Sequence, residues 1–179
     1  MNKENKDCFV IMPISTPTGY SNNHFDIIYR HIIKPAIKKA GFKAIRADEV
    51  SATNKIIDDI IDRLNKSAIV LCDLSSNNPN VLYELGLRHA INKPTVLIKD
   101  DITKSIFDIT MWRWMEYPSN INLGEDKTII AKLKTAIIET YQSNENLDNI
   151  NQAKEQVQDS HATKNIQNVN KENKENSGN

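Results

Sequence analysis

The chain has 179 residues, of which 39% are hydrophobic and 26% are charged, a composition typical of a soluble globular protein with one domain. Its 23 basic residues equal its 23 acidic residues, so the total charge indicates neither a nucleic-acid groove nor an anionic membrane surface as partner. The first residues have no apolar signal-peptide core, and no apolar run approaches the ~20 residues of a membrane span. We therefore expect a cytoplasmic protein that binds neither nucleic acid nor membrane.

The N-terminal part of the chain predicts two strands and two helices. After a polar leader over residues 1–7, the apolar run 8–14 predicts the first strand. Isoleucines and alanines at helical spacing predict a helix over about 25–40, with Pro35 a kink or an early break. Residues 42–46 predict a second, short strand. A second helix then begins near residue 51 or 53.

The central part of the chain continues this alternation. Residues 68–72 are apolar without alternation, as expected of a strand buried on both faces of a parallel sheet. Asn78 can cap the following helix, and Pro79 suits its first position. The remaining predicted elements are strands over 94–99 and 112–117 and an amphipathic closing helix over 126–141. Regular alternation of strands and helices implies an α/β fold with a doubly wound parallel sheet.

Residues 144–179 differ in composition from the predicted domain over 8–143. They contain ten asparagines and four glutamines, no aromatic residue and only scattered aliphatic residues. Such a segment cannot bury enough apolar area to offset the entropy lost on ordering. We predict a disordered tail rich in Asn, Gln, Lys and Glu.

The cysteines and histidines indicate neither a disulfide framework nor a metal site. Cys8 opens the first predicted strand and Cys72 lies well along another parallel strand, which separates the two beyond disulfide reach. Both are expected to be buried, reduced thiols. The four histidines show no Cys/His spacing of the kind that binds zinc.

Two acidic residues mark the most informative part of the sequence. Asp73 ends a predicted buried strand, and Glu84 falls in the first two turns of the next helix, beside the strand ends where open α/β sheets bind ligands. Breaking an N-glycosidic bond builds positive charge on the ribose C1′, which a nearby carboxylate can stabilise or attack. Glu84 is the candidate for that role. Asp73 could bind ribose hydroxyls or donate a proton to a leaving base, and Asn80 could orient the Glu84 carboxylate.

Both acids also have structural interpretations. Glu84 and Arg88 are spaced as an i,i+4 pair, which can be only an exposed helix ion pair. Asp73 can be only a turn residue after a strand. Trp112 and Trp114 would share one face of a strand and could form a stacking wall for a base, or pack in the core.

Several polar residues are predicted to gather at the same sheet edge. The loop after the first strand is rich in hydroxyl groups that could cradle ribose or phosphate, and Arg46 could neutralise a phosphate or form a surface ion pair. The chain has neither the glycine pattern of a dinucleotide fold nor a Walker phosphate loop, which argues against a dehydrogenase or an NTPase. The candidate substrate-binding residues are Ser15, Thr16, Tyr20, Arg46, Asp48, Asn78, Asn80, Tyr83 and Arg88.

Three segments carry a resemblance to a known superfamily. They are Phe9-Val10-Ile11-Met12-Pro13-Ile14, Asp73-Leu74-Ser75 and Asn78-Pro79-Asn80-Val81-Leu82-Tyr83-Glu84-Leu85-Gly86-Leu87-Arg88-His89-Ala90. Over roughly residues 8–117 the chain resembles the nucleoside 2-deoxyribosyltransferase-like and bacterial TIR-like superfamily. The resemblance implies a flavodoxin-like sheet of five parallel strands in the order 2-1-3-4-5. It also implies that Glu84 occupies the position of the catalytic glutamate that cleaves the N-glycosidic bond of a nucleoside or of NAD.

On this resemblance we expect a TIR-like N-glycosidase that consumes NAD or a related nucleotide as substrate, with no required cofactor and no metal. Assembly into a homo-oligomer and a role in bacterial antiviral defence follow from the resemblance alone. Two alternatives stay open: a nucleoside 2-deoxyribosyltransferase, and a non-catalytic nucleotide-binding or assembly module. The Phe-Val-Ile-Met-Pro opening of the first strand departs from the usual TIR pattern, which weakens the assignment of NAD but not that of glycosidic chemistry.

Overall fold

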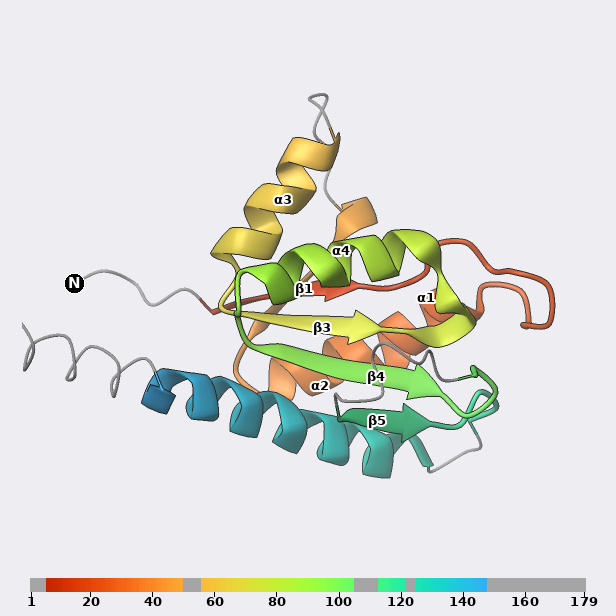
Figure 1. Ribbon diagram of the computed structural model, residues 1–179. Coiled ribbons are helices and arrows are strands. Elements are labelled where there is room, and N and C mark those ends of the chain that lie inside the picture. The colour runs from red at the N-terminus through yellow and green to blue at the C-terminus, as the bar shows by residue number, and fades with distance from the viewer. Residues whose placement is uncertain (1–5, 50–55, 105–112, 122–124, 148–179) are drawn as a thin grey trace, which may run out of the picture. The chain divides into compact units, whose positions relative to one another are not determined.

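Five parallel strands form one sheet in the order β2-β1-β3-β4-β5, the flavodoxin-like topology predicted from the sequence (Figure 1). The computed structural model describes residues 6–49, 56–104, 113–121 and 125–147. The chain divides into two compact units, residues 1–141 and 142–179, and the sheet belongs to the first. The strands are β1 Asp7–Ile11, β2 Lys43–Arg46, β3 Ile69–Asp73, β4 Thr95–Asp100 and β5 Trp114–Tyr117.

The register of the central strands places the two cysteines far apart. β1 pairs with β3 from Cys8 opposite Ile69 to Ile11 opposite Cys72. The cysteines therefore lie near opposite ends of this pair, and both are buried and free, as expected. Every residue of β3 is buried, which is why its sequence is apolar without alternation.

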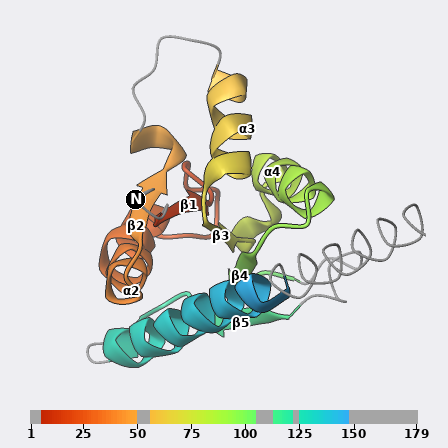
Figure 2. The ribbon, with the colours of Figure 1, turned by 90° about the vertical axis from the view of Figure 1, so that its left-hand side faces the viewer.

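One face of the sheet is covered by the helical segment that follows β1 and by the helix over residues 125–141 (Figures 1 and 2). The first segment consists of α1 (His24–Ile28), a π-helical turn η1 (Tyr29–Ile33) and α2 (Lys34–Lys39). Pro35 lies in the first turn of α2 and has no N–H to donate, and the chain accommodates it by widening the preceding turn. The helix is therefore not broken at Pro35, and the irregularity predicted there is a π-helical turn.

The opposite face is covered by α3 (Ile56–Lys66) and α4 (Pro79–Ala90) (Figure 2). Leu64 of α3 and Val81 and Leu85 of α4 pack on the β1 and β3 side chains that point to this face. Short 3-10 turns follow two strands, η2 (Ala47–Glu49) after β2 and η3 (Ser75–Asn77) after β3. The predicted start of the second helix, at residue 51 or 53, lies outside the described residues, and so does Trp112.

The closing helix extends past the predicted end at residue 141. It runs over 125–147 in the described part of the chain, so the first residues of the predicted tail, 144–147, are helical. The rest of the predicted tail, 148–179, lies outside the described residues. None of the helices described here has both the length and the apolar character needed to cross a membrane.

Candidate functional site

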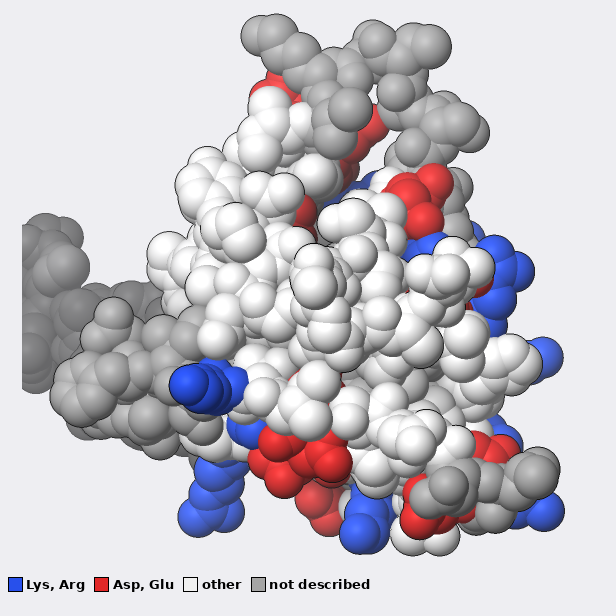
Figure 3. All heavy atoms as spheres, turned by 90° about the vertical axis from the view of Figure 1, so that its right-hand side faces the viewer, with Lys and Arg blue, Asp and Glu red and all other residues white. Residues whose placement is uncertain are grey.

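A pocket of about 560 Å³ opens where β1 and β2 end, a size within the usual range of small-molecule sites. Its walls are the end of β1 with Ile14 and Ser15, the residues 46–48 after β2, two isoleucines of α3, and the first two turns of α4. The connection after β1 leads to β2 on one side of the sheet and the connection after β3 leads to β4 on the other, so the strand order reverses between β1 and β3, and the pocket is lined by the end of β1 and by the helix that follows β3. Ligands of open α/β sheets bind at such a switch point. Figure 3 views the molecule from this side, and the centre of that view is mostly uncharged.

The start of α4 is fixed by its own sequence. Asn78 is extended and caps the helix, because its Oδ1 accepts hydrogen bonds from the backbone N–H groups of Asn80 (3.0 Å) and Val81 (3.4 Å). Pro79 occupies the first helical position, where no N–H is needed. These two predictions are confirmed. They place Glu84 in the second turn of a rigid helix, with its side chain in the pocket wall.

Glu84 is half-buried, and no described residue donates a hydrogen bond to its carboxylate or forms an ion pair with it. Burial raises the pKa of this carboxyl from 4.5 to about 7. The group is therefore close to half-ionised at neutral pH, and it is not committed to any partner in the fold. A carboxyl group with these properties in a pocket is a candidate for acid–base or nucleophilic chemistry.

Arg88 does not pair with Glu84 across the helix turn. Its side chain is fully buried and donates hydrogen bonds to three backbone carbonyl oxygens, those of Leu64, Ser67 (3.3 Å) and Pro94 (3.0 Å). The guanidinium thus ties α4 to the end of α3 and to the segments that enter β3 and β4. The helix ion pair is not formed, and Arg88 lies outside the pocket that it was expected to line.

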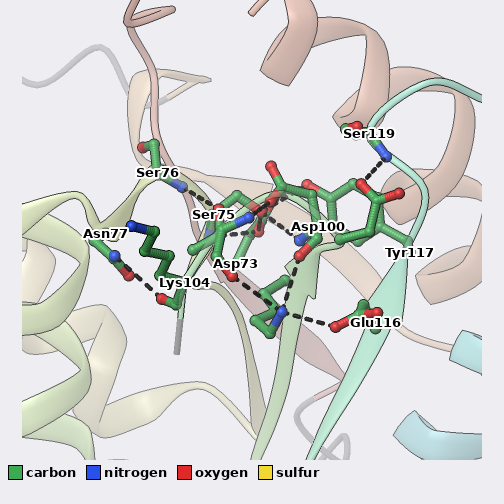
Figure 4. A network of polar contacts seen from close by, with 12 residues as sticks. Asp73, Ser75, Ser76, Asn77, Asp100, Lys104, Glu116, Tyr117 and Ser119 are labelled. Atoms are coloured by element: carbon green, nitrogen blue, oxygen red, sulfur yellow. Dashed lines mark hydrogen bonds and ion pairs between the residues drawn. The ribbon is translucent and has the colours of Figure 1, made fainter. Parts of the chain in front are cut away.

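Asp73 lies in a polar network that is separate from the Glu84 pocket. Its carboxylate is fully buried and accepts hydrogen bonds from Ser75 N (3.0 Å), Ser75 Oγ (2.6 Å) and Tyr117 OH (2.8 Å) (Figure 4). Burial raises the pKa of Asp73 to about 6, although the hydrogen bonds from Ser75 and Tyr117 oppose that shift. The candidate proton donor is thus enclosed by protein and does not line the pocket.

The same network joins the carboxyl ends of three neighbouring strands. Asp100, at the end of β4, accepts hydrogen bonds from Tyr20 OH and Thr103 N, both at 2.7 Å, and its own N–H donates to Ser75 Oγ (2.8 Å). Tyr20 was expected in the substrate site, and the structure places its hydroxyl in this network. The roles of Asp100, Ser75 and Tyr117 in this network were not predicted, because nothing in their local sequence indicates that they meet.

Arg46 and Asp48 form the charged part of the pocket wall. Arg46 Nε donates to Asp48 Oδ1 (2.5 Å) and Nη2 to Asp48 Oδ2 (2.6 Å), a bidentate ion pair. Nη2 also donates to Asp26 Oδ1 (3.0 Å), and the guanidinium lies 4.3 Å from the centre of the Tyr29 ring. The ion-pair interpretation of Arg46 is therefore the one observed. Its other partners, Asp26 and Tyr29, come from the helical segment after β1, and no sequence pattern indicated them.

The pocket unites most of the predicted site residues. Those that line it are Ser15, Arg46, Asp48, Asn78, Asn80, Tyr83 and Glu84. The predicted residues absent from its described lining are Thr16, Tyr20, Asp73 and Arg88. Apolar side chains that were not predicted complete the lining, among them Ile14, Ile57, Ile60 and Val81. Trp114 instead packs against the core under α4, with Lys99 Nζ 5.9 Å from its ring centre.

Nothing in the described part of the chain resembles a metal centre, because no group of three or more His, Cys, Asp or Glu side chains is arranged to hold an ion there. The cysteines are poor nucleophiles, since burial raises the pKa of Cys8 to about 12 and that of Cys72 well above its usual value. The groups available for chemistry in the pocket are thus the carboxyl groups, the amides and the hydroxyls of its wall.

Comparisons with known proteins add no functional information. No protein-family model matches the chain, and no curated protein matches it. Among solved structures, the constitutive lysine decarboxylase of E. coli aligns with 77% of this chain and 18% of its own, at 17% sequence identity and a TM-score of 0.41. This chain thus spans less than a fifth of that enzyme. So remote a likeness carries no argument about activity, and function has to be argued from the site.

Proposed function

We propose that this protein is an N-glycosidase that cleaves the bond between ribose and a nitrogen base, with NAD or a related nucleotide as substrate. The observation that carries the proposal is Glu84: a half-buried carboxyl group without a partner among the described residues, in a pocket at the switch point of the sheet. The TIR-like and deoxyribosyltransferase-like pattern around Glu84 supports the same chemistry, because it assigns the catalytic glutamate to this position.

The reaction needs few groups from the protein. When the bond from C1′ to nitrogen breaks, its electron pair leaves with the base and C1′ becomes electron-poor. The ionised Glu84 carboxylate can stabilise that charge or form a bond to C1′, and water then adds a hydroxyl to C1′ and releases a proton. Because Glu84 is half-buried, its carboxylate interacts with the developing charge more strongly than it would in water.

The position of Asp73 favours a leaving group that needs no proton. A neutral purine or pyrimidine leaves more readily when an acid protonates it, whereas nicotinamide leaves from a ring that is already cationic. Asp73, the candidate acid, does not line the pocket, and its carboxylate is already engaged by Ser75 and Tyr117. This arrangement supports an NAD-type substrate over a deoxyribosyltransferase reaction.

Product analysis tests the proposal. Purified protein is incubated with NAD, and free nicotinamide is measured by chromatography. The wild type is compared with Glu84→Gln and with the matched control Glu139→Gln, which changes an exposed glutamate of the closing helix. We expect the wild type and the control to release nicotinamide, and Glu84→Gln to be at least about a hundredfold slower, because it keeps the side-chain shape but loses the charge.

Two results would overturn this assignment: equal rates for Glu84→Gln and the wild type, or no nicotinamide over a wide range of protein and NAD concentrations. A new nucleoside that forms when a deoxynucleoside and a second free base are supplied would identify a transferase instead. A protein that binds nucleotides without any turnover would be the non-catalytic module.

A further inference from the structure

Asp48 is held in one orientation in the wall of the Glu84 pocket. Both of its carboxylate oxygens accept from Arg46, at 2.5 and 2.6 Å, in the planar fork that fixes a carboxylate most firmly. The Arg46 side chain is only 8% exposed, whereas the Asp48 side chain is 32% exposed. Arg46 is therefore the buried support, and Asp48 is the group that the pocket presents to a ligand.

The charges around Arg46 do not suit a phosphate. Its guanidinium serves two carboxylates, Asp48 and Asp26, and stacks on Tyr29. Arg46 has no uncommitted charge to offer, because Asp48 and Asp26 already accept hydrogen bonds from it, and Asp26 is also paired with Arg30. Inside the cavity a phosphate would meet the carboxyl groups of Asp48 and Glu84 and a guanidinium that is already paired, so the sequence-based expectation that Arg46 neutralises a phosphate is disfavoured. Donors of hydrogen bonds, neutral groups and cations suit the pocket better.

Asp48 keeps the acceptor capacity that a sugar diol needs. An ionised carboxylate has about four lone-pair positions, and Arg46 occupies two of them. The remaining positions can accept from two O–H donors at the spacing of vicinal hydroxyls. The 2′ carbon of a ribose is bonded to C1′, so a residue that binds the 2′-OH has to share a cavity with the group that acts on C1′. Asp48 and Glu84 do share one.

From this geometry we infer that Asp48, fixed by Arg46, binds the 2′,3′-diol of the substrate's ribose, so that the pocket selects ribonucleosides over 2′-deoxyribonucleosides. This inference rests on the proposed function, whose substrate class it narrows. A hydrogen bond to a charged acceptor is stronger than one between neutral groups. The partial exposure of Asp48 weakens the discrimination between ribose and 2′-deoxyribose, because water can replace the missing hydroxyl. We expect about a tenfold difference in affinity between two nucleosides that differ only in the 2′-OH.

Calorimetric binding tests this directly with adenosine and 2′-deoxyadenosine as probes. The measurements use Glu84→Gln protein, so that slow turnover does not disturb them. We expect adenosine to bind about tenfold more tightly, and Asp48→Asn to reduce that ratio to about one by weakening adenosine binding. Equal affinities for the two probes, no binding of either, or an unchanged ratio in Asp48→Asn would overturn the inference. The ratio in protein with Asp48 intact is informative whether or not the Asp48 variant folds.

Asp26→Asn is the matched control, because it removes the other carboxylate from Arg46 while the pocket wall keeps Asp48. It should retain the tenfold ratio. Loss of the ratio in both variants would show that the shape of the Arg46 cluster, and not contact with Asp48, causes selectivity. Nicotinamide release from NAD is followed in parallel. Selective binding without cleavage would refute the proposed function alone, and cleavage without ribose selectivity would refute this inference alone.

Discussion

At the scale of single residues, two charged side chains one helical turn apart have opposite surroundings. Glu84 is half-buried with no partner among the described residues, while Arg88 is fully buried and makes hydrogen bonds to three carbonyl oxygens. Their i,i+4 spacing allowed a helix ion pair as the structural alternative, and that pair does not form. The long Arg88 side chain instead reaches past the helix and donates to backbone carbonyl oxygens at the end of α3 and at the entry to β4.

The substitution Arg88→Met should strongly destabilise the fold. Methionine fills much of the volume but leaves the carbonyl oxygens of Leu64 and Ser67 without this donor, at ~1–3 kcal/mol for each buried unsatisfied group, whereas Pro94 O keeps its hydrogen bond from Val70 N. Urea denaturation should show a loss of several kcal/mol. The exposed Arg30→Met is the control, because its ion pair with Asp26 lies at the surface, where such pairs contribute little to stability. Similar losses in the two variants would contradict the structural role of Arg88.

At the scale of elements, the carboxyl ends of β3, β4 and β5 are joined by buried polar side chains. Asp73, Asp100 and Tyr117 end these three strands, and Ser75 contacts all three of them. Figure 4 shows how closely their polar groups converge. A network of this kind sets the spacing of the strand ends, and it contains a titratable group whose charge is costly to bury.

The network gives the fold a defined dependence on pH. Asp73 has a pKa near 3.8 in the unfolded chain and about 6 in the fold. Between pH 3.8 and pH 6 the folded state therefore holds a proton that the unfolded state has lost. The stability that Asp73 contributes is therefore fully present below its unfolded pKa of 3.8 and is lost as the pH rises to about 6, a difference of about 3 kcal/mol. Nearby Asp100 contributes to this shift by repulsion.

Thermal unfolding at pH 4.5 and pH 7 tests this dependence. The raised pKa of Glu84 acts in the same direction, so the measurement is made on Glu84→Gln protein. The lowered pKa values of His24 and His89 act in the opposite direction, so the test is the comparison with the same protein carrying Asp73→Asn. Going from pH 7 to pH 4.5 should change the melting temperature of the protein with Asp73 more favourably than that of the double variant. An equal change in both would show that Asp73 is not responsible.

At the scale of the whole molecule, the strands and helices of the sheet could be predicted because the sequence patterns that indicate them are local. Apolar runs fixed the strands, Asn78 and Pro79 fixed the start of α4, and regular alternation fixed the parallel topology. The position of the pocket was predicted, because the carboxyl ends of parallel strands meet at one edge of the sheet. The division of polar residues between the pocket and the Asp73 network was not predictable, since Asp73 and Tyr117 are 44 positions apart and meet only through tertiary packing.

The apolar part of the pocket was missed for a related reason. Ile57 and Ile60 follow the helical spacing of α3, which indicates a core-facing stripe, and spacing alone does not show that one end of the stripe overhangs a cavity. The function proposed here therefore depends on which residues the fold gathers around Glu84, and less on the motif taken alone.

The pH dependence of kcat/KM for nicotinamide release from NAD tests the role of Glu84 most directly. If the ionised carboxylate acts on C1′, kcat/KM should rise with pH through about 7, the pKa of Glu84 in the free protein, and level off above it. Glu84→Gln should lose this rise together with most of the activity. A rate that falls as the pH increases past 7, or a rise of the same size in Glu84→Gln, would contradict the account.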